Sequence, residues 1–166
     1  MVICQNTDGE VNFTLLGKFN SVADQTSGDR LGFTDGSTYY KATGLGYTTP
    51  SEYAAGTAGG FTDAAQYQTA ANLGYTNLSD YNAGTAGGFT DANQFNNARA
   101  LGYTNSTDYA NGQLGGFTNN AEYQAATAGG LTNASDYHNA QAAGYSTKSS
   151  YDQSLATPTA TPEWQQ

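Results

Sequence analysis

Few residues in this chain of 166 residues could do chemistry. The sequence holds one histidine and one cysteine, so most metal sites and most pairs of a nucleophile with a base are excluded at the outset. His138 occupies a position where equivalent segments carry Gln68, Asn82 or Gln124, and we expect it on the surface. The acidic residues are spread singly, which favours helix capping over paired acid–base catalysis, and no glycine-rich phosphate loop is present. We therefore expect no catalytic residue, no cofactor and no metal, and a protein that is not an enzyme.

Two covalent modifications have acceptor residues in the sequence. Asn-x-Ser/Thr acceptor sites for glycosylation stand at Asn12, Asn77, Asn105 and Asn133. The last three recur every 28 residues, so glycans there would form a row, whereas the alternative is that these asparagines only cap helices. Cys4 is predicted to be a small core residue, or one half of an intermolecular disulfide in an oxidising compartment.

Charge and composition exclude several classes of partner. Five Lys and Arg stand against fourteen Asp and Glu, which leaves a formal charge of −9. Nucleic acids and anionic membrane surfaces both require basic residues, so neither is an expected partner. No apolar run approaches the roughly 18 residues of a membrane span, and we see no signal peptide at the N-terminus.

The elements that must carry these residues follow a period of 14 residues. Glycine followed by a large apolar residue, and then by Thr or Ser, recurs nine times without an insertion, from Gly32-Phe33 to Gly144-Tyr145. A second aromatic residue follows six positions after the first, from Tyr39 to Tyr151. Such regular recurrence is the signature of a repeat protein, in which each copy is stabilised by its neighbours.

Each copy carries start and stop signals of a short helix. The residue after the Thr is an N-cap type in all nine copies, and the residue three positions later is usually acidic or Gln, as in a capping box. The repeated glycine stands where a left-handed residue ends a helix. These signals predict helices of about nine or ten residues, for example after Asp63, with an apolar stripe of Ala64, Tyr67, Ala70 and Ala71 that continues to Leu73.

Adjacent copies alternate in their last residues. One kind ends in Leu-Gly-Tyr, as at 45–47, and the other has Gly-Gly before the apolar residue, as at 59–61. The predicted fold is therefore an all-α repeat protein, a short-helix α-solenoid of 28-residue helix pairs. A β-solenoid and a disordered chain are the alternatives, because short β-solenoids have coils of similar length and large aliphatic residues are scarce.

The two ends depart from the period. Residues 1–16 contain two β-rich runs around Asp8-Gly9, which predicts a β-hairpin cap. Residues 17–154 hold ten short-helix repeats, the first of them atypical. Residues 155–166 form a Thr/Pro-rich tail, which is typical of an extended linker.

These features favour a structural protein. The scarcity of large aliphatic residues suggests that the repeats need further burial, and the low charge removes a barrier to contact between copies. We expect self-assembly into a filament, coat or surface appendage, located outside the cell or on a cell or virion surface. The alternative is a monomeric solenoid that binds glycan or peptide ligands.

Overall fold

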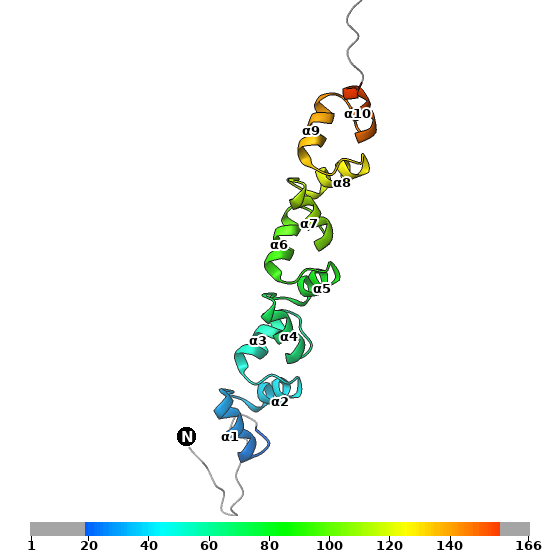
Figure 1. The fold of residues 1–166 in the computed structure, drawn as a ribbon. Helices are drawn as coiled ribbons and strands as arrows, with labels where there is room; N and C mark the ends of the chain where they lie inside the picture. Colours follow the sequence, from blue (N-terminus) through cyan, green and yellow to red (C-terminus); the bar gives the residue numbers. More distant parts are fainter. Residues whose placement is uncertain (1–18, 157–166) are drawn as a thin grey trace, which may run out of the picture. The chain divides into compact units, whose positions relative to one another are not determined.

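The computed structural model describes residues 19–156, a range that contains helices and no strand. The helices are α1 (Val22–Leu31), α2 (Gly36–Gly44), α3 (Pro50–Ala58), α4 (Ala64–Asn72), α5 (Leu78–Ala86), α6 (Ala92–Ala100), α7 (Ser106–Leu114), α8 (Asn120–Ala128), α9 (Ala134–Ala142) and α10 (Lys148–Ala156) (Figure 1). The prediction of an all-α tandem repeat of short helices is confirmed over this range. The hairpin predicted for residues 1–16 lies outside the described residues, as do residues 157–166 of the predicted tail. The first two residues of that tail, Leu155 and Ala156, instead belong to α10, so the last helix ends two residues later than predicted.

The chain divides into two compact units, Met1–Ala83 and Gly84–Gln166. The boundary falls within α5. In the first unit α1 packs on α2, α2 on α3 and α3 on α4, and in the second α6 packs on α7, α7 on α8 and α8 on α9. Within each unit, therefore, every one of these helices is supported by its neighbours in the sequence.

The helices begin where the sequence predicts. The cap side chain accepts a hydrogen bond from the backbone N–H three residues later, as Asp63 does from Gln66 at 2.9 Å. The same bond is made by all the predicted caps, namely Asp35, Thr49, Asn77, Asp91, Asn105, Asn119, Asn133 and Thr147, and by Ser21 of the atypical first repeat. The bond satisfies one of the backbone donors that a helix leaves open at its first turn.

The step from glycine to a large apolar residue that follows each of the helices α1 to α9 closes a Schellman motif. At the end of α2, Gly46 has a φ of 82°, a left-handed conformation that favours glycine. The N–H of Tyr47 donates to the carbonyl of Ala42 at 2.9 Å, and the N–H of Gly46 donates to that of Thr43 at 3.0 Å. This motif commonly brings an apolar residue after the glycine against the last turn of the helix. It explains why a large apolar residue follows the glycine in every copy.

A second backbone contact joins alternate helices. The C-cap carbonyl of one helix accepts from the first N–H of the helix two further along, as Gly59 does from Leu78 at 2.8 Å. In the first unit Leu45 pairs with Ala64 in the same way, and in the second unit the pairs are Gly87–Ser106, Leu101–Asn120, Gly115–Ala134 and Gly129–Lys148. We call this series the backbone ladder. It satisfies a free carbonyl at one helix end and a free N–H at another.

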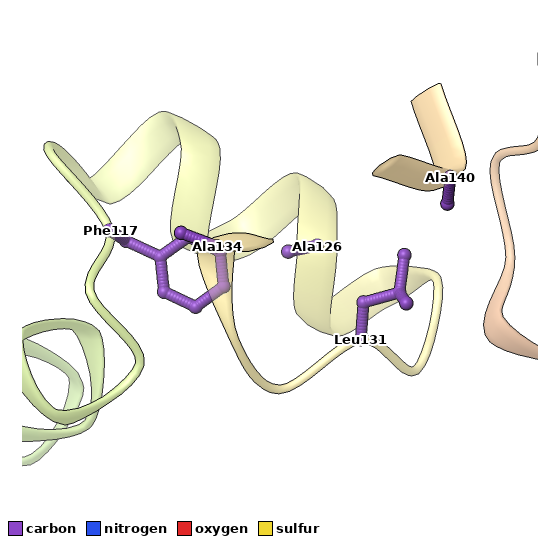
Figure 2. Packing of buried hydrophobic residues seen from close by; sticks show 5 residues of the cluster. All are labelled: Phe117, Ala126, Leu131, Ala134 and Ala140. Carbon is purple, nitrogen blue, oxygen red and sulfur yellow. The ribbon is translucent and has the colours of Figure 1, made fainter. Parts of the chain in front are cut away.

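Small and aromatic residues make the core. One cluster in the first unit consists of Phe33, Ala42, Tyr47 and Ala64, with Tyr39, Tyr53 and Tyr67 packed against it. The corresponding cluster of the second unit, around α8 and α9, consists of Phe117, Ala126, Leu131, Ala134 and Ala140 (Figure 2). The first aromatic residue of a copy meets the second edge-on, as in Tyr47 and Tyr53, whose ring centroids are 5.6 Å apart. This geometry suits the charge distribution of aromatic rings.

The predicted apolar stripe of α4 is only partly correct. Ala64 and Ala70 are buried, but Tyr67 and Leu73 are half-buried and Ala71 is exposed. Only the first and seventh residues of the helix are fully buried, while Tyr67 packs against the core cluster with part of its ring exposed.

Alternate copies fill the core in two ways. Phe33 and Phe117 share their clusters with Ala42 and Ala126, respectively. Tyr47 and Tyr103 instead lie over Gly56 and Gly112, where an added Cβ would overlap the tyrosine hydroxyl. The longer tyrosine side chain thus lies over a glycine, which has no Cβ methyl group. The atypical first repeat differs, because there Phe19 lies over Gly28.

Candidate functional site

The three described asparagines of the glycosylation acceptor sites cap α5, α7 and α9. In each, the side-chain oxygen accepts from the N–H of the aspartate three residues later at 2.8 Å, and the amide nitrogen donates to that aspartate's carboxylate. These pairs are Asn77–Asp80, Asn105–Asp108 and Asn133–Asp136. Their capping role is confirmed, and their glycosylation stays a prediction. Asn12 and Cys4 lie outside the described residues.

The residue at the third helical position does not bond as a capping box predicts. Instead of the cap's own N–H, Glu122 accepts from the N–H and hydroxyl of Thr118, the residue before the cap, at 2.9 and 2.8 Å. Gln94 does the same with Thr90. The difference follows from side-chain length, because Glu and Gln extend past the cap whereas Asp stops at the cap side chain. It also gives the recurrent Thr a purpose that sequence reasoning missed.

The caps also avoid like charges. Aspartate caps are followed at the third helical position by uncharged residues, as in Asp63–Gln66 and Asp91–Gln94, whereas the acidic residues at that position follow Asn, Thr or Ser caps. Two carboxylates at this distance would repel each other in partly buried surroundings. Apart from Asp29 and Asp152, the acidic residues between residues 19 and 156 are therefore accounted for as parts of caps.

His138 is exposed, as predicted, with 58% of its side chain accessible. Its Nε2 contacts the carboxylate of Glu122, whose side chain is 13% accessible. The same relation between a helix and the next one brings Gln124 Nε2 to 3.3 Å from Asp108 and the Tyr40 hydroxyl to 2.8 Å from Asp24. These bridges were not predicted. The period of the repeat could have located them, because in each bridge the two partners are 16 residues apart.

The side chains of Glu122 and His138 link α8 to α9. The N–H and hydroxyl of Thr118 donate to the Glu122 carboxylate and are the main reason that its pKa is lowered, with a smaller contribution from His138. A carboxylate with a lowered pKa is a weaker base. The Thr118 hydroxyl donates its hydrogen bond to the Glu122 carboxylate and not to the imidazole. The pair therefore lacks the arrangement of an activated nucleophile.

The hydroxyls of Tyr47 and Tyr103 are enclosed by the repeats. Tyr47 and Tyr103 are 1% and 2% exposed, and burial is the main cause that raises the pKa of both phenols. Tyr47 donates to the carbonyl of Asp63 at 3.2 Å, whereas the Tyr103 hydroxyl is buried without a hydrogen-bond partner. An ionised phenolate would be costly at either position, so both tyrosines are packing residues at neutral pH.

The first unit contains a pocket of about 340 Å³ between α3 and α4. It is lined by Ala55, Tyr67, Ala71, Gly74, Tyr75 and Thr76. This volume is at the lower end of the range for small-molecule sites. None of the lining residues is charged, so the pocket can accept an apolar group but offers little to hold an ion.

Residues 19–156 contain no cluster of three or more His, Cys, Asp or Glu side chains that could hold a metal ion. None of the described helices has the length and hydropathy of a membrane span. The sequence matches no protein-family model, and no curated protein and no solved structure is significantly similar to it.

Proposed function

We propose that this chain is a non-enzymatic structural protein whose repeats assemble copies of the chain into a filament, coat or surface appendage. The observation that carries this proposal is the backbone ladder. In each ladder pair the C-cap of the earlier helix supplies the carbonyl and the first residue of the later helix supplies the N–H, so the repeats of one chain complement one another by a single recurring contact. Surfaces that complement themselves without a rotation that closes the assembly generate open-ended polymers.

The composition of the surface supports the same proposal. Charged residues make up 11% of the chain, against about 25% in ordinary globular proteins. Copies of net charge −9 repel one another, but salt at 0.1 M screens this repulsion at separations beyond about 10 Å. Contacts between copies would therefore rely on apolar and hydrogen-bonding groups, and should strengthen as salt is added.

Light scattering coupled to size exclusion, together with negative-stain images, tests the proposal. The full chain is measured over a hundredfold range of concentration at about 20 mM and 500 mM NaCl. We expect species larger than 17.3 kDa whose mean mass rises with concentration and with salt. A monomer under all these conditions, including the highest concentration, contradicts self-assembly.

A location outside the cell or on a cell or virion surface is part of this proposal. The surface is dominated by amides and hydroxyls, and three described caps stand in glycosylation acceptor sites. A glycan on these caps would leave other faces of the helices free for contact.

A monomeric binding module for glycans or peptides is the second candidate. The second aromatic residue of each copy is half-buried in every case except Phe95, so tyrosine edges remain accessible beside the pocket near Tyr67. Tyrosine with amides and hydroxyls suits such ligands. Shifts of the tyrosine resonances on titration with neutral oligosaccharides, in a chain that stays monomeric, would favour this candidate.

A further inference from the structure

We propose that Leu114 of one copy docks into the pocket between α3 and α4 of a second copy. This inference rests on the proposed self-assembly and names one contact that drives it. Leu114 belongs to the second unit and the pocket to the first, so every molecule carries both partners of the contact, one in each unit.

One small residue distinguishes the lining of this pocket from the equivalent place in the other repeats. Ala71 lines it from α4 and is exposed. At the equivalent position of the other repeats from α2 onward the side chain is always larger: Thr43, Thr57, Thr85, Arg99, Gln113, Thr127, Gln141 and Leu155. An alanine at this position leaves open the space that a longer side chain fills elsewhere.

Leu114 differs from its equivalents in the opposite sense, because it is larger and apolar. It is the last residue of α7, and 86% of its surface is accessible, more than for any other large hydrophobic residue of the described range. The equivalent residues of the other repeats from α2 onward are all small or polar: Gly44, Ala58, Asn72, Ala86, Ala100, Ala128, Ala142 and Ala156. An exposed leucine contributes nothing to the core of its own unit, and burial in a partner would remove its apolar surface from water.

The absence of charge at both surfaces favours this contact between two copies of the chain. Copies of net charge −9 repel each other over most approaches, but the pocket has no charged lining residue. The last turn of α7 is also uncharged, since its sequence ends in Asn-Gly-Gln-Leu and its acidic residue, Asp108, is in the first turn. The two surfaces can therefore approach without bringing carboxylates together, and the contact should strengthen as salt screens the remaining repulsion.

The size of the contact sets its strength and its symmetry. One leucine buries far less than the roughly 1,200 Å² of a standard interface, so the contact is weak and is populated only at high concentration or alongside other contacts. Each molecule carries one leucine and one pocket, so it can bind one partner through each. Two molecules that exchange both contacts close a dimer, whereas contacts made with two different molecules extend a chain of copies.

Two substitutions test the contact with little risk to the fold, because each introduces a residue that other repeats carry at that position. Leu114→Ala removes the leucine, and Ala71→Thr fills the pocket. We expect each variant, at the same concentration and salt as the wild type, to lose the contact, with the association constant reduced at least tenfold. Leu155→Ala is the matched control, since it removes another exposed leucine, 68% accessible, and should change nothing.

Mixing the two variants gives the decisive result. The Leu114→Ala variant still has a pocket and the Ala71→Thr variant still has a leucine, so an equimolar mixture should form dimers that contain one of each and grow no further through this contact. Sedimentation velocity of the mixture, compared with each variant alone, measures this.

The outcomes separate this inference from the proposed function. If the wild type assembles and both variants assemble equally well, the contact is wrong while self-assembly stands. If the wild type stays monomeric throughout, both are wrong. A change in either variant that is independent of concentration would show that Leu114 contacts its own chain, which also overturns the inference.

Discussion

The hydroxyl of Tyr103 occupies the space that a Cβ of Gly112 would need. Tyr47 and Gly56 have the same relation, whereas Phe33 and Phe117 share their clusters with alanines. The alternation of Tyr with Phe along the chain is therefore a matter of volume. Tyr47 and Tyr103 are each accommodated by a glycine inside the following helix.

This volume match predicts a reciprocal rescue. Gly112→Ala should lower the free energy of unfolding by about 1–3 kcal/mol, because the methyl group overpacks the site. Adding Tyr103→Phe should recover part of this loss, because it removes the hydroxyl, the atom nearest the Cβ position, while the ring carbons Cζ and Cε1, at 2.6 and 3.0 Å, remain and must shift. Urea unfolding of both single variants and the double variant measures the coupling. A double variant no more stable than Gly112→Ala contradicts the match.

The first glycine of each Gly-Gly pair should tolerate no side chain. A Cβ at Gly59 would lie 2.5 Å from the carbonyl oxygen of Thr76, although the φ of Gly59 is an ordinary −78°. Gly59→Ala should therefore cost about 1–3 kcal/mol through this clash alone. Gly44 is the matched control, because nothing lies within 4 Å of its Cβ position, and Gly44→Ala should be neutral or stabilising by up to about 1 kcal/mol. Equal effects of the two substitutions on thermal unfolding would refute the account.

Stability should fall at alkaline pH. Burial raises the pKa of Tyr47 and Tyr103 above the value of about 10 in an unfolded chain. Above that pH the folded chain holds more protons than the unfolded one, so the free energy of unfolding decreases as the pH rises, by up to about 1.4 kcal/mol per pH unit for each tyrosine. Denaturant unfolding between pH 8 and 11 measures this decline, which should be shallower in Tyr103→Phe. An identical slope in that variant would exclude Tyr103 as a contributor.

The pair of residues that forms one cap should be replaceable by the pair found in another repeat. Asn105→Asp keeps a capping oxygen but places a second carboxylate beside Asp108, which now accepts from the Asn105 amide at 2.8 Å. We expect a loss of about 0.5–1 kcal/mol. Adding Asp108→Gln recreates the Asp–Gln pair of α4 and α6 and should recover most of the loss. Asn105→Ala, which removes the cap itself, should cost about 1 kcal/mol and should gain nothing from Asp108→Gln.

Glycosylation of Asn77, Asn105 and Asn133 has a direct measurement. Protein from its native source should show an intact mass above 17.3 kDa, with sugar on some of these asparagines. Thr107→Val should remove the sugar at Asn105 while its cap hydrogen bonds, which do not involve Thr107, remain. An unmodified mass from the native source would leave these residues as caps alone.

The sequence alone determined the helices and their ends. Caps such as Asp63 and the glycine of Gly46-Tyr47 act within one turn of a helix, through hydrogen bonds whose partners are three to five residues apart. A 14-residue period repeats these local signals, so element type and boundaries were readable without any knowledge of the packing.

Tertiary structure decided which surfaces those helices cover. The ladder bond between Gly59 and Leu78, the bridge between Glu122 and His138 and the exposure of Ala71 all depend on where a neighbouring helix lies. The direction in which one helix leaves the preceding Gly-aromatic step sets these contacts, and it results from the sum of many packing interactions. The spacing of residues along the chain does not contain this information. For that reason the sequence predicts Ala71 as a core residue, whereas in the fold it lines a pocket.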